Sequence, residues 1–554
     1  MIKRSATFAL GISLGFILAF ISVALLNSEI TGNTVAEASK IIGLEFTEAE
    51  RDSMIEDLEN AREDYQAIRE LKLPNSVSPS LVFNPVPPGK TFNHIREPIS
   101  WDVPSDVTLP DNRSDLAFYT VKELASLIKH RKITSRELTE FFIDRLQRYD
   151  DTLHAVVTLT EERALEQAEK LDKEMEAGNY RGPLHGIPYG LKDLFAVEGY
   201  KTTWGAGPFK EQTLDITATV AQRLDEAGAV LVAKTTLGAL AWGDVWFGGK
   251  TRSPWNPERG SSGSSAGSAA ATAAGLVPFA IGTETLGSIV SPSSRTGTTG
   301  LRPSFGRVSR HGAMALSWSM DKVGPITRSV EDAAIVFNAI YGPDGHDQSL
   351  VDLPFNYKQQ ADLSKLRIGY LKSAFDRDYY NHEHDSATLA VLRELGAELI
   401  PMELPDYPAG ELSFILSAEG AAAFDQLTLT GKDDEMVRQV RNAWPNVFRA
   451  ARFIPAVEYI QANRAREVLI QKMDSVMQNV DVYLSPAFGG SNLVLTNLTG
   501  HPSVVLPNGF NDNGEPTSIT FMGGLFDEAT LLAVAKKYQQ ATGFHKQHPE
   551  LFSK

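Results

Sequence analysis

Residues 259–312 constrain the fold more than any other part of the chain, because they are crowded with glycine, serine and alanine. A stretch of this composition usually makes a flexible linker. Here it is interrupted by the apolar run Ala273–Ile281 and followed by residues typical of strands and turns, which a solvated linker would not contain. Small residues let a backbone approach a ligand closely. We therefore interpret the segment as a functional loop set between buried elements.

The composition excludes several classes of protein. Hydrophobic residues make up 42% of the 554 residues and charged residues 22%, which is enough for a large buried core. The 53 Lys and Arg against 69 Asp and Glu give a net charge of −16, which argues against a nucleic-acid partner. The chain has no cysteine, so disulfides, zinc–thiolate sites, iron–sulfur clusters and cysteine nucleophiles are all excluded.

The amino terminus has the pattern of a targeting segment. Lys3 and Arg4 precede an uncharged, mostly apolar run from Ser5 to Ser28, which is typical of a signal peptide or a single membrane anchor. No cleavage motif lies close behind Leu26, so both alternatives stay open. This segment predicts an exported protein, secreted or held at the cell envelope, with a possible membrane tether.

The rest of the chain divides into an extension and a body. We expect residues 29–112 to form an N-terminal extension, helical at first and then an extended proline-rich connector at 74–89. From residue 113 to 554, predicted helices and strands alternate, which favours one α/β domain. Residues 409–480 are almost entirely helical by pattern. The expected early elements are helices at 119–130, 134–149, 160–177 and 218–227, and strands at 186–191 and 229–232.

Three motifs carry a family resemblance. The loop Gly263–Ala269 reads GSSAGSA, the turn Gly282–Ser288 reads GTETLGS, and the upstream segment 182–195 contains Lys192. Their order, with 72 residues from Lys192 to Ser264 and 24 from there to Ser288, resembles the amidase signature family. The motif details are most similar to peptide-amidase-like members. The resemblance implies a single large α/β/α domain, in which helices cover a mixed central β-sheet.

The resemblance also implies a catalytic triad. Carried over by position, Ser288 is the nucleophile, Ser264 the bridging serine behind a cis peptide bond from Gly263, and Lys192 the base. A serine hydroxyl needs a neighbouring base to become a good nucleophile. A lysine can be that base only when it is neutral, which requires a desolvated site that lowers its pKa. Lys192 lies in a largely apolar run, as such a site would need.

The turn before the nucleophile is the expected oxyanion hole. By resemblance, its donors are the backbone N–H groups of Thr285, Leu286, Gly287 and Ser288. Leu286 replaces a glycine common in the family, and Glu284 and Val290 replace an Asp and an Arg. Peptide-amidase-like members share the glutamate, so we interpret these changes as marks of a subfamily. How Leu286 alters specificity stays open.

Other chemistry-bearing residues are assigned structural roles. Ser268 is expected to cap its loop, and the side chain of Asp193 is expected on the face of its strand opposite Lys192. One or two of the tryptophans near the motifs should line the substrate pocket, and by resemblance the helical region 409–480 faces it. The run His382–Asp385 could bind a metal, but we expect a solvated loop. No metal or cofactor is expected.

These observations predict a serine amidohydrolase that cleaves non-peptide or terminal carboxamide C–N bonds through an acyl-enzyme. The expected partner is a small-molecule or peptide amide, and the oligomeric state is open. One alternative is the glutaminase-type subunit of a tRNA amidotransferase, which works in the cytoplasm and therefore conflicts with the apolar amino terminus. Another alternative is a catalytically silent binding protein of the envelope.

Overall fold

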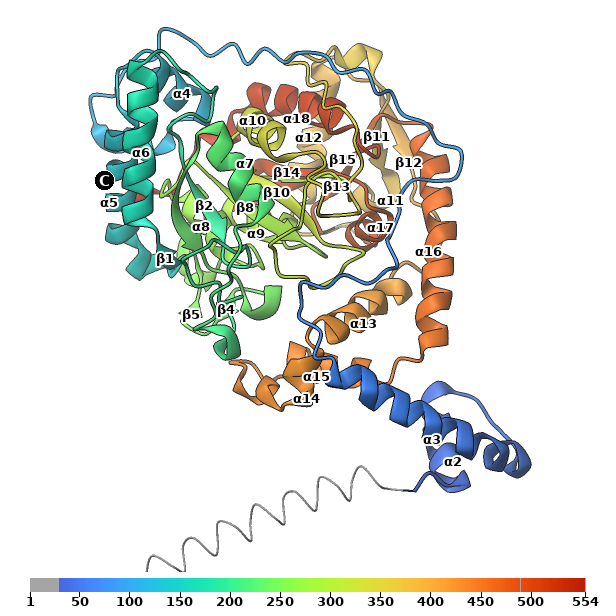
Figure 1. Cartoon of the computed structure of the whole chain (residues 1–554). Coiled ribbons are helices and arrows are strands. Elements are labelled where there is room, and N and C mark those ends of the chain that lie inside the picture. The colour runs from blue at the N-terminus through green and yellow to red at the C-terminus, as the bar shows by residue number, and fades with distance from the viewer. Residues whose placement is uncertain (1–28, 489, 554) are drawn as a thin grey trace, which may run out of the picture. The chain divides into compact units, whose positions relative to one another are not determined.

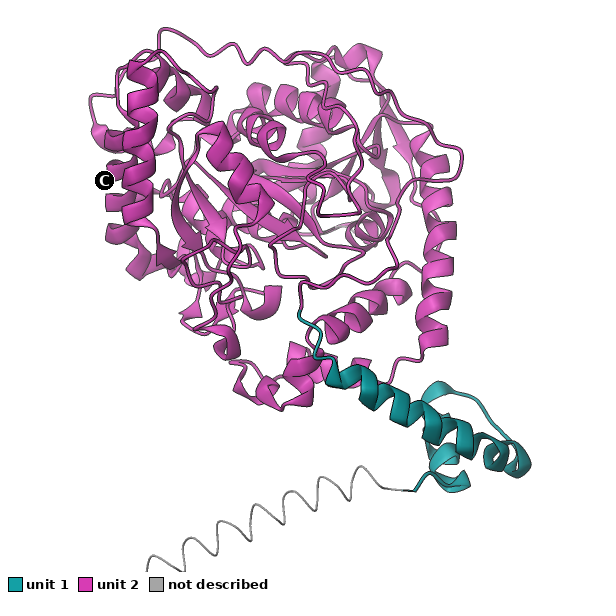
Figure 2. Cartoon of the chain, viewed as in Figure 1, with its two compact units in different colours: residues 1–74 teal, residues 75–554 magenta. Residues whose placement is uncertain are grey.

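The structure is a computed structural model that describes residues 29–488 and 490–553. Its contacts divide the chain into two compact units, residues 1–74 and residues 75–554 (Figure 2). The expected targeting segment, 1–28, lies outside the described residues. Across the described ranges, no helix is both long enough and apolar enough to cross a membrane.

The first unit is helical where it is described. Helix α2 spans Gly32–Ile42 and helix α3 spans Glu48–Glu70. Each begins with a capping box, in which the side chain of Thr31 or Thr47 accepts a hydrogen bond from the backbone three residues later. This agrees with the helical pattern expected early in the extension.

The second unit is built on an 11-stranded mixed sheet in the order β1-β3-β2-β8-β10-β9-β14-β15-β13-β11-β12 (Figure 1). Parallel pairs join β3 to β2, β2 to β8, β13 to β11 and β11 to β12, and the other neighbours are antiparallel. The strands are β1 Val156–Leu159, β2 Pro188–Lys192, β3 Val230–Thr235, β8 Phe279–Glu284, β9 Thr299–Arg302, β10 Lys322–Thr327, β11 Ile368–Leu371, β12 Leu399–Met402, β13 Val482–Pro486, β14 Ser503–Phe510 and β15 Pro516–Gly523. Two small hairpins add β4 Val245–Trp246 with β5 Gly249–Lys250, and β6 Arg252–Ser253 with β7 Asn256–Gly260.

Helices cover both faces of this sheet. Strand side chains alternate between faces, so Ala280 of β8 packs with alanines of α8, while its neighbours Phe279 and Ile281 pack in the cluster that contains Val336 of α10. The helices of this unit are α4 Val121–Lys129, α5 Ser135–Leu153, α6 Glu161–Glu176, α7 Thr219–Ala227, α8 Ala266–Ala273, α9 Val290–Thr296, α10 Val330–Ile340, α11 Lys372–Phe375, α12 His382–Glu394, α13 Phe414–Ala423, α14 Asp425–Leu429, α15 Trp444–Ala451, α16 Ala456–Met477, α17 Asn492–Thr499 and α18 Glu528–Thr542. The α/β/α fold implied by the resemblance is confirmed.

Two features differ from the sequence expectations. The run His382–Asp385 is not a solvated loop, because it begins α12 and its Asp385 is buried. Asn508 and Tyr379 donate hydrogen bonds to the Asp385 carboxylate, which lets the charge lie inside the fold. The proline-rich connector is extended as expected, but from residue 75 onward it groups with the second unit.

The cap of α5 provides a test of the local structure. Thr134 accepts a hydrogen bond from the N–H of Glu137 at 3.1 Å, and the Glu137 carboxylate accepts one from the N–H of Thr134 at 2.9 Å. We expect Thr134→Ala to lower the free energy of unfolding by about 1 kcal/mol, measured by urea denaturation. Lys170→Ala, on the exposed face of α6, is the control and should stay within about 0.5 kcal/mol of wild type. Equal midpoints for the two variants would contradict the capping role.

Candidate active site

The ends of two parallel strands bring the sequence-predicted residues together. Lys192 is the last residue of β2, and the turn with Ser288 follows the end of β8. Because β2 and β8 are parallel neighbours, both ends lie at the same edge of the sheet. The loop with Ser264 leads into α8, which packs on both strands. The edge therefore gathers all three residues of the expected triad.

The amine of Lys192 is enclosed by hydroxyl groups. Its Nζ lies 2.8 Å from Ser264 Oγ, 2.8 Å from Thr283 Oγ1 and 3.0 Å from Ser265 Oγ. Among the described residues no carboxylate pairs with it, and the side chain is fully buried. Burial lowers the pKa of Lys192 to about 7, against the smaller opposing effects of Asp321 and Glu284. A large fraction of this lysine is therefore neutral near pH 7.

The bridging-serine loop has the expected backbone form. The peptide bond between Gly263 and Ser264 is cis, as the resemblance implies. A Cβ on Gly263 would lie 1.9 Å from the carbonyl oxygen of Gly243, so a larger residue does not fit there without movement. Ser264 itself is 1% exposed. Glycine fits at position 263 because the backbone of Gly243 approaches it too closely for a side chain.

Ser288 lies beside this loop. The N–H of Ser265 donates a hydrogen bond to the carbonyl oxygen of Ser288 at 3.1 Å, which links the two loops. Within residues 29–488 and 490–553, the Ser288 hydroxyl forms no hydrogen bond with Ser264. Catalytic hydrogen bonds are often long before substrate binds, so the lack of this hydrogen bond does not contradict the expected triad.

The expected oxyanion turn presents free donors. In the described part of the chain, the backbone N–H groups of residues 285–288 have no acceptor. Gly287 has a φ of +84°, a conformation that glycine adopts readily. The turn can therefore point several N–H groups at one negatively charged oxygen.

Glu284 makes contacts at this turn that the sequence did not indicate. Its Oε2 accepts hydrogen bonds from the N–H groups of Ile289 and Val290, both at 2.9 Å. Its Oε1 accepts from Arg302 at 2.8 Å and from Asn497 at 2.9 Å. Burial alone would raise the pKa of Glu284, but Arg302 and these hydrogen bonds outweigh it and bring the pKa to about 2. The buried carboxylate thus holds both ends of the turn that contains Ser288.

Thr285 is positioned by a second carboxylate. The Thr285 hydroxyl donates to Asp321 Oδ1 at 2.6 Å, and the N–H groups of Leu316 and Ser317 donate to Oδ2 at 2.8 and 3.0 Å. Burial raises the pKa of Asp321, while these donors lower it. Asp321 therefore ties the oxyanion turn to the loop 313–321. Neither Ser265 nor Thr283 nor Asp321 was singled out from the sequence as a member of the site.

Two residues assigned structural roles have structural contacts. The Asp193 carboxylate forms a buried ion pair with Lys234 at 2.7 Å and accepts from the N–H of Thr203 at 2.9 Å. The Ser268 hydroxyl donates to the carbonyl of Ile281 at 3.0 Å. Both groups are engaged away from the Lys192 amine.

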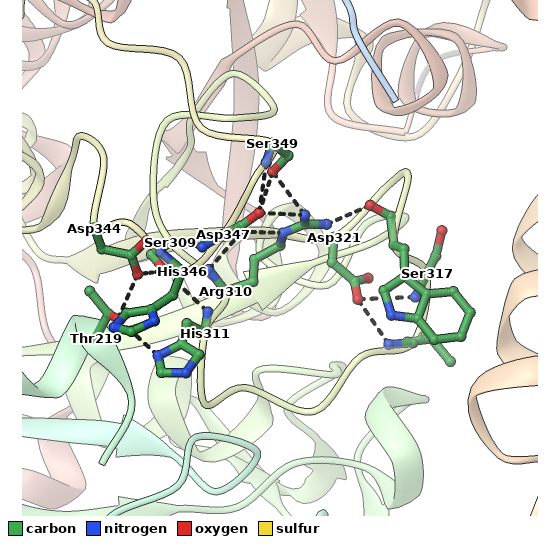
Figure 3. Close-up of polar contacts among 12 residues, drawn as sticks. Thr219, Ser309, Arg310, His311, Ser317, Asp321, Asp344, His346, Asp347 and Ser349 are labelled. Atoms are coloured by element: carbon green, nitrogen blue, oxygen red, sulfur yellow. Dashed lines mark hydrogen bonds and ion pairs between the residues drawn. The ribbon is translucent and has the colours of Figure 1, made fainter. Parts of the chain in front are cut away.

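A cavity of about 360 Å³ adjoins the cluster. Trp318 lines it, as expected of at least one tryptophan, together with His311 and Arg310. Figure 3 shows Arg310 held by Asp347, with which it forms an ion pair at 2.8 Å. The described helices of 409–480 contribute no residue to the lining, but Glu419 of α13 accepts a hydrogen bond from Ser317 at 2.6 Å. Further lining residues are Thr283, Thr285, Met314 and Leu316.

The groups around the Lys192 amine indicate which chemistry the site can perform. The groups around Lys192 are hydroxyls and carbonyls, and the described residues contain no cluster of three or more His, Asp or Glu side chains that could hold a metal ion. The arrangement can remove a proton from a serine and stabilise an oxyanion next to it.

Comparison with known proteins gives concordant results. The family model described as Amidase matches residues 137–493. The A subunit of glutamyl-tRNA(Gln) amidotransferase from Moorella thermoacetica is 34% identical over 487 residues, covering 79% of this chain and 99% of that protein. The equivalent protein of Thermosynechococcus vestitus is 31% identical and covers 78% and 99%. The solved structure of native peptide amidase from Stenotrophomonas maltophilia aligns with a TM-score of 0.69 at 30% identity, covering 76% of this chain and 97% of that one.

These relatives correct the expected location. From the apolar run at 5–28 we expect an exported protein. Export is inconsistent with an amidotransferase component, which works in the cytoplasm. The curated relatives are nevertheless such components, over nearly their whole length. The expectation of an exported, envelope or membrane-tethered protein is therefore wrong. A short apolar pattern is weaker evidence for the location of a protein than similarity over a whole domain, because the pattern depends on hydrophobicity alone.

The role of Glu284 can be tested through stability. Removing one partner of a buried ion pair leaves the other charge unpaired, so we expect Glu284→Gln to cost about 3–5 kcal/mol in the free energy of unfolding. Asp352→Asn is the matched control, because it breaks the exposed pair with Arg96 and should cost less than about 1 kcal/mol. Denaturant titration of both variants measures the difference. A loss at Glu284 no greater than that of the control would contradict the assignment.

Proposed function

Because the chain belongs to the amidase family, we propose that it hydrolyses a carboxamide through an acyl-enzyme formed on Ser288. Enzymes of this family act on C–N bonds and bind small amide substrates. The observation that carries the proposal is the buried Lys192 amine, 2.8 Å from Ser264 Oγ and with a pKa of about 7.

The proton path follows from these contacts. The lone pair of neutral Lys192 accepts the Ser264 proton, and Ser264 in turn accepts the proton of Ser288. The Ser288 oxygen then bonds to the amide carbon, and the carbonyl electron pair moves onto its oxygen. The proton returns from Lys192 through Ser264 to the nitrogen as the C–N bond breaks. Water attacks the ester by the same route and releases the acid and free Ser288.

The oxyanion turn supplies the second part of the catalysis. In the proposed reaction the free N–H groups of residues 285–288 bind the oxyanion, and each such donor contributes about 2.7–4 kcal/mol in known acyl-transfer enzymes. Glu284 and Asp321 hold this turn from both sides. Preorganised donors need no rearrangement when the charge develops, which supports hydrolysis by this site.

A role as one component of an amidotransferase is the second candidate. It is supported by the 31–34% identity to curated members of such complexes over 99% of their length. In that case the chain would release ammonia from an amide and require partner subunits to use it. If the purified chain hydrolyses amides without any partner, the hydrolase proposal is favoured. If its activity requires the other amidotransferase subunits, the amidotransferase role is favoured.

The nucleophile can be identified by labelling. We expect a fluorophosphonate to label the purified protein on Ser288 and Ser288→Ala to remain unlabelled. Ser268→Ala, whose hydroxyl is engaged with Ile281, should keep the label. No label on wild type between about pH 7 and pH 10, with no hydrolysis across a panel of amides, would overturn the catalytic proposal and favour a silent binding protein.

The base can be identified by its pH dependence. Neutral Lys192 is the active form, so kcat/KM should rise with pH through a midpoint near 7, which is its pKa. Lys192→Ala should lower kcat/KM by about 10²–10⁴-fold and abolish this midpoint in the residual activity. Lys201→Ala, which removes an exposed amine, is the control and should keep the wild-type profile. A wild-type rate in Lys192→Ala would show that another group is the base.

A further inference from the structure

One wall of the cavity is made by a segment far from the catalytic motifs. Residues 76–82, which we name the strap, form an extended stretch without helix or strand. Ser76, Ser78, Pro79, Ser80, Leu81 and Val82 all line the cavity. The family model begins at residue 137, so the strap is outside the part of the chain that matches it.

The strap is anchored at its two ends. On one side, Asn75 donates to the carbonyl of Ala315 at 2.8 Å and accepts from the N–H of the same residue at 2.8 Å. On the other side, the ring of Phe83 packs edge-on against Phe305 with 5.0 Å between centroids, and the guanidinium of Arg466 lies 3.5 Å from its centroid. Both anchors attach to parts of the second unit that are close to the cavity.

Between the anchors, residues 76–82 are exposed on their outer side and belong to no hydrophobic cluster. Within the described residues, no hydrogen bond joins the strap to any other segment. Pro79 has no N–H to donate, and Leu81 is 78% exposed. A segment held in this way can be altered without removing a contact of the fold, so it is suited to set the size of the cavity.

The cavity and the catalytic cluster share residues. Thr283 lines the cavity and contacts Lys192 Nζ at 2.8 Å, and Thr285 lines the cavity and belongs to the oxyanion turn. A substrate bound to the turn therefore extends into the space that the strap closes. At about 360 Å³, this space is near the lower end of the range for ligand sites.

The charges in the cavity point to an uncharged ligand. Arg310 is bound to Asp347 through both carboxylate oxygens, at 2.8 and 3.0 Å (Figure 3). Burial lowers the pKa of His311, which favours the uncharged form of its ring. Trp318 lines the cavity with an uncharged ring, and its Nε1 has no hydrogen-bond acceptor among the described residues. An anionic group would therefore meet no unpaired cation among the described residues that line this part of the site.

We propose that the strap is a specificity wall that restricts the enzyme to small, uncharged carboxamides. The inference rests on the proposed hydrolase function and adds the substrate class. It assigns the size limit to residues 76–82 and the preference for neutral substrates to the paired state of Arg310.

Three substrates test both parts. Butyramide is small and neutral, 4-phenylbutyramide is neutral and longer, and succinamate is close to butyramide in size but anionic. For wild type, we expect kcat/KM for butyramide to exceed that for each of the others by at least about tenfold. Comparable values for butyramide and succinamate would overturn the charge preference.

Two strap variants test the size limit. Asn75→Ala releases one anchor, and Pro79→Gly/Leu81→Gly loosens the strap while both anchors stay in place. In each variant, the ratio of kcat/KM for 4-phenylbutyramide to that for butyramide should rise at least about tenfold. Arg96→Ala is the control, because it breaks an exposed contact between the N-terminal extension and Asp352, outside the cavity, and should leave the ratio unchanged.

The outcomes separate the two proposals. If wild type hydrolyses butyramide and both strap variants keep its substrate ratio, the strap inference is wrong and the hydrolase proposal stands. Labelling rates of Ser288 with a methyl and a phenylbutyl fluorophosphonate give a second measure that needs no turnover, and they should show the same change in ratio. If neither probe labels wild type and no amide is cleaved, the hydrolase proposal fails and the inference with it.

Discussion

The site depends on the removal of one amine from water. Lys192 ends a strand whose residues are all buried, so its ammonium form loses hydration that no carboxylate among the described residues replaces. The surrounding hydroxyls of Ser264, Ser265 and Thr283 stabilise a neutral amine well, since each can donate or accept a hydrogen bond. The fold thereby places a base with a pKa of about 7 inside its core. The large sheet and its covering helices provide the burial that this requires.

Two further carboxylates complete the environment without neutralising that base. Glu284 forms an ion pair with Arg302 and accepts hydrogen bonds from the turn. Asp321 accepts hydrogen bonds from Thr285 and from the loop 313–321. Burial lowers the pKa of Lys192 by more than Asp321 or Glu284 raises it. This division keeps the donors of the turn rigid and leaves the lysine free to accept a proton. The same loop 313–321 carries Ala315, to which the strap is anchored, so the wall of the cavity is attached close to the catalytic turn.

Much of the fold and part of the site could be predicted because the signals are local. The capping box of Thr134 and Glu137 is a short pattern, and the structure begins a helix at Ser135, directly after Thr134. The motif loops also mark Lys192, Ser264 and Ser288 at characteristic spacings. Glu284 carried no such signal, because its partners Arg302 and Asn497 are 18 and 213 positions away. Asp321 and the strap were missed for the same reason, since their roles arise from contacts between distant segments.

The sequence by itself determined the family, the α/β architecture and the positions of the expected triad, because its three motifs resemble those of the amidase signature family in residue type, order and spacing. Its apolar amino terminus misled on location, since hydropathy alone does not distinguish between uses of an apolar segment. Only the tertiary structure decided which groups surround Lys192, how far burial lowers its pKa, and which residues bound the cavity. The physical reason is that desolvation and hydrogen bonding depend on which atoms lie close together in space, and the order of residues along the chain does not specify those contacts.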